Sequence, residues 1–270
     1  MRIGEAVLRA FSRKPDTSDY NQDTEREVQG TELSLLQREF PQFTALLKGK
    51  RVVDFGCGTG RQSIALVMEG ASHVCGIDTN ARTLSKAKQL ASEIGIQDSK
   101  LIFVERPSNE VIGTFEIVIS KDSMEHFPDP IVALNEMKSL IRPGGQILIT
   151  FGPPWFAPYG SHMHFFCKVP WLNILFSERT VMNVRAFYRS DGAKRYEEVE
   201  SGLNKMTIRK LETIISQSGL VTQYRKYSCI KNQHWMSRIP FLRELFVNHI
   251  SCILTLPCNK ALQPTAKSGA

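Results

Sequence analysis

The sequence predicts an α/β fold in which a doubly wound parallel sheet is covered by helices on both faces and carries an inserted cap. First, short apolar segments alternate with helical segments from residue 51 to residue 151. Second, these short segments are apolar almost throughout, as is typical of parallel strands buried on both faces. Third, the alternation stops after Phe151, where residues 153–200 are rich in Pro, His and aromatic side chains. A segment of this length is too long for a plain loop and indicates an insertion.

Each element before the cap has a local signal. The helix over 80–94 has apolar residues at helical spacing. The helix over 130–140 begins with a proline, which the first turn of a helix tolerates, and RPGG at 142–145 turns the chain into the next strand. In order, we expect a helix over 31–48, a strand over 51–55, a helix over 61–69, a strand over 73–77, a helix over 80–94, strands over 101–104 and 115–120, a helix over 130–140 and a strand over 146–151.

The sheet pattern resumes after the cap. Thr207 is a good N-cap and Gly219 a good C-terminal stop for a helix over 207–218, which leads into a strand over 220–229. Apolar residues alternate in the final apolar segment, so we expect the last strand at 249–256. An amphipathic helix that continues from Pro240 is the competing interpretation.

Both ends of the chain have simpler patterns. Ile3, Val7, Leu8 and Phe11 fall on one helical face, which predicts a docking helix or, as the alternative, a membrane-surface anchor. Residues 15–30 are polar and predict a loop, and residues 259–270 predict a disordered tail.

Composition narrows the class of protein. The 270 residues carry a formal net charge of +7 that is spread along the chain, which disfavours nucleic-acid binding. No CxxC pair occurs among the six cysteines, a pattern typical of free thiols in a reducing compartment. We therefore expect a cytoplasmic protein, with contact at a membrane surface left open. The oligomeric state is not indicated.

The segment VVDFGCGTG, residues 52–60, indicates the ligand. Its glycines follow a G-x-G-x-G order, and Arg61 stands where a dinucleotide loop would have its third glycine. An acid, Asp54, precedes the glycines, and a second acid, Asp78, ends the next strand, where it suits the hydroxyls of a ribose. This pattern favours an adenosyl amino acid over a dinucleotide.

VVDFGCGTG and GIDTN, together with FEIVISKDSMEHFPDP and LIRPGGQILIT, resemble class I S-adenosylmethionine-dependent methyltransferases, most of all the type 11 group. The resemblance spans roughly residues 45–152, with a looser match over 207–256. It implies a Rossmann-like sheet of seven strands with the last one antiparallel, and S-adenosyl-L-methionine as the cofactor.

The resemblance also implies roles for matching residues. The glycine loop would lie against the amino-acid part of the cofactor, Asp54 near its ammonium, Asp78 and Thr79 at its adenosine, and Ser120 at its methionyl edge. The family's acid after the third strand is replaced here by FVERPS, in which Glu105 is the nearest candidate for the adenine contact. The expected cofactor-binding residues are Asp54, Gly56, Cys57, Gly58, Gly60, Asp78, Thr79, Glu105 and Ser120.

Three histidines are candidates for catalysis. His126 follows the fourth strand beside the expected methyl group, and a histidine is suited to act as a general base near neutral pH. His162 and His164 would share one face if their segment is extended. No third ligand is signalled nearby, so we expect no metal. The aromatic residues of the cap are either substrate walls or the cap's own core: Trp155, Tyr159, Phe165, Trp171 and Phe176.

The expected function is methyl transfer to a hydroxyl or amine of a small-molecule acceptor, with a sugar- or lipid-linked acceptor conceivable. The alternatives are a non-catalytic methyltransferase-like binding protein and a nucleotide-dependent oxidoreductase. We divide the chain into an N-terminal helical segment, 1–48, a cofactor-binding core, 49–152, an inserted cap or substrate lobe, 153–202, the C-terminal part of the core sheet, 203–258, and the tail, 259–270.

Overall fold

The computed structural model describes residues 3–14, 30–199 and 202–257. Most of the polar segment predicted as a loop, 15–29, and the whole of the predicted tail, 259–270, lie outside the described residues.

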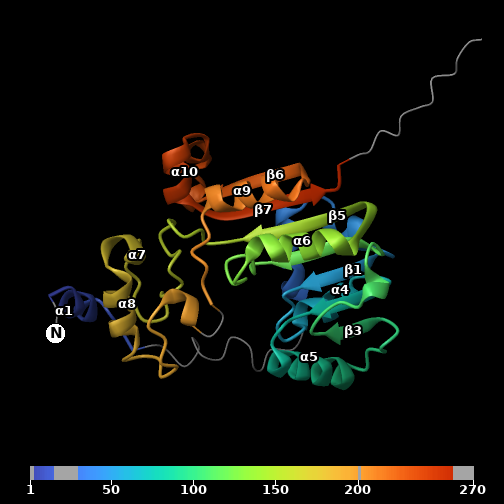
Figure 1. The fold of residues 1–270 in the computed structure, drawn as a ribbon, viewed down its shortest axis with the longest axis horizontal. Coiled ribbons are helices and arrows are strands. Elements are labelled where there is room, and N and C mark those ends of the chain that lie inside the picture. The colour runs from blue at the N-terminus through green and yellow to red at the C-terminus, as the bar shows by residue number, and fades with distance from the viewer. Residues whose placement is uncertain (1–2, 15–29, 200–201, 258–270) are drawn as a thin grey trace, which may run out of the picture.

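Seven strands form one sheet in the order β3-β2-β1-β4-β5-β7-β6 (Figure 1). The five strands from β3 to β5 pair in parallel, whereas β7 pairs antiparallel with both β5 and β6. The α/β class, the seven strands and the antiparallel last strand are therefore confirmed. The strands are β1 (Arg51–Phe55), β2 (His73–Ile77), β3 (Leu101–Val104), β4 (Phe115–Lys121), β5 (Ile141–Phe151), β6 (Val221–Cys229) and β7 (Val247–Thr255).

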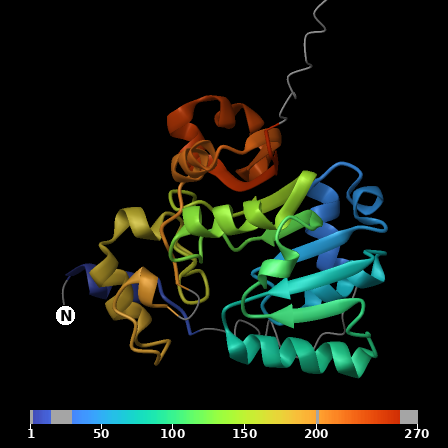
Figure 2. The ribbon, with the colours of Figure 1, turned by 45° about the vertical axis from the view of Figure 1, so that its right-hand side comes forward.

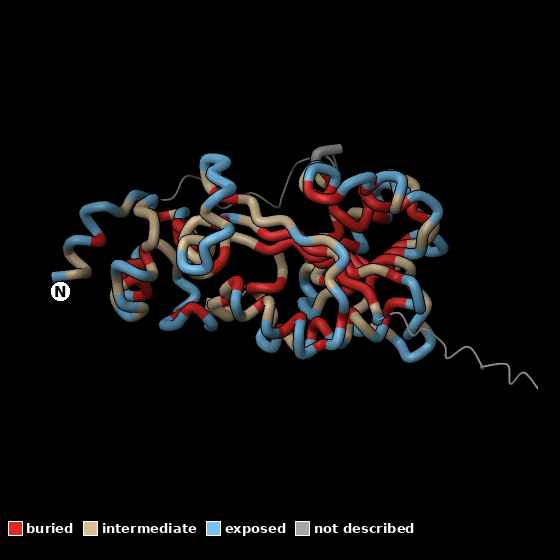
Figure 3. The backbone as a smooth tube through the Cα atoms, turned by 90° about the horizontal axis from the view of Figure 1, so that it is seen from above, coloured by how far each residue is buried: buried red, intermediate tan, exposed pale blue. Residues whose placement is uncertain are grey.

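Helices cover both faces of the sheet, and alternate strand residues point to opposite faces. Val53 of β1 packs into the core beneath α6 and α9, whereas the adjacent Val52 packs into the core beneath α2 to α5. Buried backbone accordingly runs through the middle of the sheet, with exposed segments around it (Figure 3). The covering helices are α2 (Ser34–Glu39), α3 (Phe43–Leu47), α4 (Arg61–Met68) and α5 (Ala81–Ile94) on one face, and α6 (Pro130–Leu140) and α9 (Ile208–Ser218) on the other.

The predicted helix over 31–48 is wrong, because Pro41 interrupts it. A 3-10 turn, η2 (Gly30–Leu33), leads into α2, and Phe40 then adopts an extended conformation with φ −113° and ψ 119° before α3 begins. Proline disfavours helical backbone in the residue before it, which explains this break.

The last segment of the sheet contains both the predicted strand and a helix that starts at Pro240, the competing interpretation. A short helix, α10 (Pro240–Phe246), is followed directly by β7, so the last strand is confirmed and begins two residues earlier than expected. The remaining short turns are η3 (Asn109–Val111), η5 (Ile230–Asn232) and η6 (His234–Arg238).

Between β5 and α9 the chain forms the cap, a lobe with a hydrophobic core of its own (Figure 2). It contains α7 (Leu172–Leu175), α8 (Glu178–Arg185) and η4 (Tyr196–Glu198). Trp155 packs edge-on against the buried Tyr196, with ring centroids 4.8 Å apart. Trp155, Phe165 and Phe176 are partly buried and pack against this core.

The N-terminal helix, α1 (Ile3–Ala10), packs against α8 of this lobe. Leu8 is fully buried there, which confirms a docking role for one residue of the predicted face. The other three residues of that face do not dock: Ile3, Val7 and Phe11 are 86%, 41% and 64% exposed. The prediction that all four apolar residues dock is therefore wrong for three of them, because the contact with α8 covers only part of the helix.

Candidate functional site

The glycine loop folds back over the end of β2. The backbone N–H groups of Gly56 and Cys57 both donate to the carbonyl oxygen of Ile77, at 2.8 and 3.0 Å. Gly56, Gly58 and Gly60 all have positive φ, at 82°, 52° and 75°, a conformation that favours glycine. The sharp turn therefore explains the G-x-G-x-G order.

Asp78 fixes this loop from the end of the neighbouring strand. Its Oδ2 accepts a hydrogen bond from the Gly58 N–H at 2.8 Å, and its Oδ1 accepts one from the Asn80 N–H at 2.9 Å. The two acids at the ends of β1 and β2 are thus brought to one edge of the sheet, as ligand sites in open α/β sheets require.

Asp54 is committed to the protein interior. Its side chain is 1% exposed, and its two oxygens accept hydrogen bonds from Gln62 Nε2 and Ser63 Oγ, each at 2.6 Å. Burial raises the pKa of Asp54, and these hydrogen bonds counteract that rise. Asp54 therefore anchors the first turn of α4 to β1. Gln62 and Ser63 carry no motif, so the sequence did not reveal this anchor.

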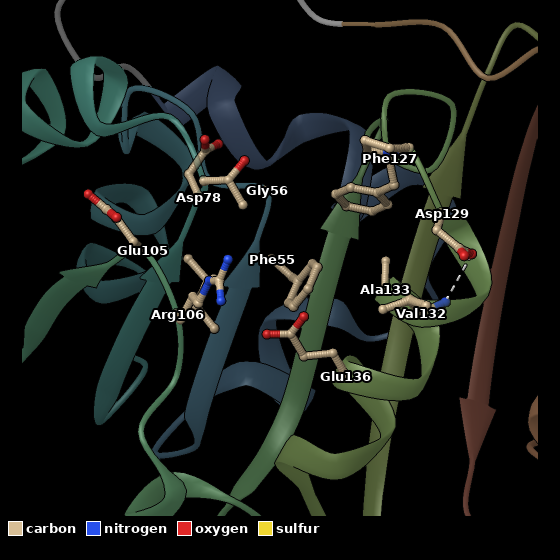
Figure 4. A pocket seen from close by; sticks show the side chains of 13 residues that line it. Phe55, Gly56, Asp78, Glu105, Arg106, Phe127, Asp129, Val132, Ala133 and Glu136 are labelled. Atoms are coloured by element: carbon tan, nitrogen blue, oxygen red, sulfur yellow. Dashed lines mark hydrogen bonds between the residues drawn. The ribbon is translucent and has the colours of Figure 1, made fainter. Parts of the chain in front are cut away.

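Two cavities meet at Gly56 and together form a trough along this edge. The first has a volume of about 490 Å³ and includes Gly56, Asp78, Thr79 and Glu105 among its lining residues (Figure 4). The second has a volume of about 260 Å³ and includes Asp54, Gly56, Cys57 and Gly58. Most of the expected cofactor-binding residues thus line one trough.

Gly60 and Ser120 line neither cavity. A Cβ atom on Gly60 would lie 2.6 Å from Phe103 Cζ and 2.7 Å from Ala87 Cβ, so this glycine permits close packing of the loop on β3 and α5. Ser120 is fully buried in β4. The structure thus gives Gly60 a packing role and places Ser120 in the interior of the sheet.

Glu105 lies at one side of the first cavity, opposite Phe127 and Asp129 (Figure 4). Arg106 and Glu136 extend into the lower part of the same cavity, and no sequence motif identified them.

His126 and His162 lie together between the core and the cap. Their ring centroids are 5.7 Å apart and the rings are nearly perpendicular. His126 Nδ1 lies 2.8 Å from the carbonyl oxygen of Gly202. A carbonyl only accepts, so Nδ1 carries the hydrogen, and a neutral His126 keeps a lone pair on Nε2.

His162 is a neutral imidazole at physiological pH, because burial lowers its pKa to about 4 and the nearby His126 adds to this effect. Its Nε2 is buried and has no hydrogen-bond partner among the described residues. His164, by contrast, is exposed. The condition under which His162 and His164 would share one face is not met, because the residues around His162 form turns and His162 itself has a positive φ of 55°.

Two further cavities share His162. One, of about 190 Å³, lies between the core and the cap and is also lined by His126, Arg185 and Arg189. The other, of about 410 Å³, opens between the cap and the start of β7 and is also lined by Tyr159, His164 and Lys168.

Two acids beside these histidines have unusual environments. Glu125 is 3% exposed, its Oε2 has no hydrogen-bond partner among the described residues, and burial raises its pKa to about 8. Asp122 has a positive φ of 48°, and its Oδ1 accepts from Thr150 Oγ1 at 2.9 Å and lies 3.1 Å from His249 Nε2. The described residues contain no cluster of three or more His, Cys, Asp or Glu side chains that could hold a metal ion.

Known proteins resemble the part of the chain that contributes most of the residues lining the trough. Residues 46–152 match the family model described as "Methyltransferase domain". The Ubiquinone biosynthesis O-methyltransferase of Pseudomonas aeruginosa is 38% identical over 106 residues, which cover 38% of this chain and 45% of that protein. The protein of the same name from Ralstonia nicotianae is 35% identical over 120 residues, covering 44% and 50%. The chain thus matches about half the length of these relatives.

Solved structures extend the likeness to most of the chain. An S-adenosylmethionine-dependent methyltransferase from Mesorhizobium loti superposes with a TM-score of 0.54 at 15% identity, covering 84% of this chain and 99% of that one. The magnesium protoporphyrin IX methyltransferase of Synechocystis, solved with bound S-adenosylhomocysteine, gives a TM-score of 0.51 at 15% identity, covering 94% and 100%. The chain has the class I S-adenosylmethionine-dependent methyltransferase fold, and its residues 46–152 match the family model of the methyltransferase domain.

Proposed function

We propose that this chain is an S-adenosylmethionine-dependent methyltransferase acting on a small-molecule acceptor. The observation that carries the proposal is the trough on both sides of Gly56, with the Asp78 carboxylate on the adenosine side and the glycine loop on the other. Asp78 lines the first cavity, which supports a contact with the ribose hydroxyls, and Gly58 has open space above its Cα, which lets a ligand approach the backbone closely.

The acceptor group is proposed to be a hydroxyl, in keeping with the names of the O-methyltransferase relatives. The cofactor supplies an already activated methyl group, so the chain must orient the hydroxyl, exclude water and accept a proton. His126 suits the role of base because Gly202 fixes its tautomer and leaves Nε2 as the accepting atom. His162, neutral near physiological pH, is the second candidate, and the exposed His164 is assigned to acceptor binding.

The cap is proposed as the acceptor lobe. Its two cavities meet at His162, which would place an acceptor next to the histidine pair. Tyr159 offers an aromatic wall at the entrance, whereas Trp155 and Phe165 stabilise the lobe from within.

The test is a screen with methyl-labelled S-adenosylmethionine against paired probes that differ in one group, such as catechol and aniline. We expect label in a hydroxyl-bearing product. His126→Gln should lower kcat about 100-fold or more, within the usual contribution of a general base, and leave cofactor affinity unchanged. Label found only on amines would contradict the hydroxyl assignment. Cofactor binding with no product from any probe or metabolite extract would favour the alternative of a non-catalytic binding protein.

We also propose that α1 contacts an anionic membrane surface. Ile3, Val7 and Phe11 are exposed apolar residues at helical spacing, and the same segment carries Arg9, whose guanidinium lies over the exposed Phe187 ring, 4.3 Å from its centroid. No described helix is long and apolar enough to cross a membrane, so the contact would be peripheral. Co-sedimentation with phosphatidylglycerol vesicles should fall several-fold in Phe11→Ser. It should not change in Val221→Ser, a control on exposed β6, and equal behaviour of the two variants would refute the proposal.

A further inference from the structure

The cavity of about 190 Å³ between the core and the cap brings histidines and charged side chains together. Its lining includes the two histidines His126 and His162 and the charged residues Arg185, Arg189 and Asp191. Among the described residues of this lining, the histidines apart, two guanidinium groups thus face one carboxylate, which leaves one positive charge in excess. A partly enclosed cavity with an excess of positive charge favours an anionic ligand.

Arg185 is a buried cation whose hydrogen-bonding capacity is not filled. The residue is 5% exposed, and its two terminal nitrogens donate to the two carboxylate oxygens of Asp191, at 2.7 and 2.6 Å. Its Nε is also buried, and it has no hydrogen-bond partner among the described residues. A buried donor without a partner costs free energy, so an anionic oxygen that accepted from Nε would remove this cost.

Arg189 brings the second cation to the cavity from the segment that follows α8. Its guanidinium lies over the ring of Phe165, 4.9 Å from the centroid, and Phe165 also lines the cavity. This contact positions the guanidinium at the cavity wall. Guanidinium N–H groups match the geometry of carboxylate and phosphate oxygens, so the two arginines suit a ligand with such a group.

The two histidines offer accepting atoms rather than donors. His126 Nδ1 donates to the carbonyl oxygen of Gly202. His162 forms a hydrogen bond with the backbone of Pro153, which has a carbonyl but no N–H, and its Nε2 has no partner among the described residues, so Nδ1 is the donor here too. In the neutral rings both Nε2 atoms therefore keep a lone pair, which suits a ligand hydroxyl.

We infer that the acceptor carries an anionic oxygen group, a carboxylate or a phosphate, in addition to its hydroxyl. Arg185 Nε and Arg189 bind the anionic group in this cavity, and the histidine pair faces the hydroxyl. The inference rests on the proposed function and names the class of acceptor. The cavity is smaller than the roughly 300–1,000 Å³ of sites for drug-sized ligands, so it takes a compact group. A larger acceptor would continue into the cavity of about 410 Å³, which shares His162.

Calorimetric titration with three phenols tests this inference without requiring methyl transfer. Phenol has the hydroxyl alone, para-hydroxybenzoate adds a carboxylate, and para-hydroxyphenyl phosphate adds a phosphate, so the last two distinguish the kinds of anion. Each titration is made with and without saturating S-adenosylhomocysteine. We expect the wild type to bind at least one of the anionic phenols about tenfold or more tighter than phenol, as expected for charge-assisted hydrogen bonds.

Two variants assign this preference to the arginines. Arg189→Met keeps a side chain that packs on Phe165 but removes the charge, and it should weaken binding of the preferred anionic phenol roughly tenfold while changing that of phenol less than about twofold. Arg185→Lys keeps a cation beside Asp191 but lacks the Nε donor, and it should have the same effect. Arg189→Met decides alone if Arg185→Lys does not fold. Arg179→Met is the matched control, because Arg179 is exposed on α8 and lines neither of the two cavities.

The inference is overturned if the wild type binds neither anionic phenol more tightly than phenol. It is also overturned if Arg189→Met keeps the wild-type preference, or if it loses affinity for phenol equally, because Arg189 would then only shape the cavity. The proposed function fails separately. If the anionic phenols are preferred but no acceptor is ever methylated, the cavity is an anion site of a protein that is not a methyltransferase.

Discussion

At the residue scale, the glycines of the G-x-G-x-G loop have different surroundings. Gly60 is enclosed by Phe103 and Ala87, whereas nothing lies within 4 Å of a Cβ placed on Gly58. The sequence predicted the loop and its turn, because glycine order reports backbone conformation. It could not separate a glycine enclosed by side chains from one with open space above it, because that difference depends on β3 and α5, which are distant in the chain.

This difference predicts unequal losses of stability. Gly58→Ala should lower the free energy of unfolding by about 1–2 kcal/mol, the cost of a left-handed conformation at a residue with a Cβ. Gly60→Ala adds overpacking and should cost roughly 2–5 kcal/mol in total. Urea unfolding of the two variants measures both values, and equal losses would contradict the packing role of Gly60.

The buried carboxyl of Glu125 predicts a pH-dependent stability. Burial raises its pKa from an ordinary 4.5 to about 8, so between these values the folded state holds a proton that the unfolded state has released. The contribution of Glu125 to stability is therefore greatest at the acidic end of this window and is lost as the pH rises through it. Glu125→Gln is neutral in both states. As the pH rises through this window, the free energy of unfolding of the variant should increase relative to that of the wild type, by up to about 1.4 kcal/mol per pH unit.

Chemical unfolding of both proteins near the two ends of that window tests this prediction. A stability difference that stays constant with pH would show that Glu125 is ionised normally.

At the element scale, the sequence placed the strands well and failed where packing decides. Residues 51–55, 73–77 and 101–104 match β1, β2 and β3 end to end, because a short apolar segment between turn residues leaves little choice. The prediction of one helix over 31–48 was wrong, because Pro41 breaks the helix although the apolar pattern continues through it. The turns around His162 were not predicted, because the Pro and aromatic residues of this segment recur at neither the helical nor the strand spacing.

The docking of α1 on the cap predicts a contrast between two of its apolar residues. Leu8 is fully buried in the cap core, so Leu8→Ala should lower stability by roughly 2–5 kcal/mol. Ile3 is 86% exposed, and Ile3→Ala should change stability by less than about 0.5 kcal/mol. Unfolding followed by the fluorescence of the cap's Trp155 and Trp171 measures both. A small effect of Leu8→Ala would mean that α1 is not part of the cap's core.

At the scale of the whole molecule, three cores support one site. The two cores on the opposite faces of the sheet fix the strand ends that carry Asp54 and Asp78, and the cap core fixes the segment that carries His162. The sequence predicted the fold and most of the residues that line the trough, since both depend on local motifs. The ion pair between Glu32 and Arg61 and the His126–His162 contact join segments 29 and 36 residues apart, and no local pattern reports such contacts.

The proposed division at residues 153–202 predicts unequal protection across the molecule. The cap has the smallest core, so its amides should exchange with solvent faster than those of β1 and β4. Hydrogen-exchange mass spectrometry measures this directly. Protection in α8 equal to that in β4 would argue for one cooperative unit without a separate lobe.

The central claim is that the trough around Gly56 binds S-adenosylmethionine, and titration calorimetry with S-adenosylhomocysteine and NAD tests it most directly. We predict that the wild type binds S-adenosylhomocysteine and not NAD. Asp78→Ala should weaken that binding more than about tenfold, from the loss of charge-assisted hydrogen bonds to the ribose. Binding of NAD without S-adenosylhomocysteine, or unchanged affinity in a folded Asp78→Ala variant, would contradict the account.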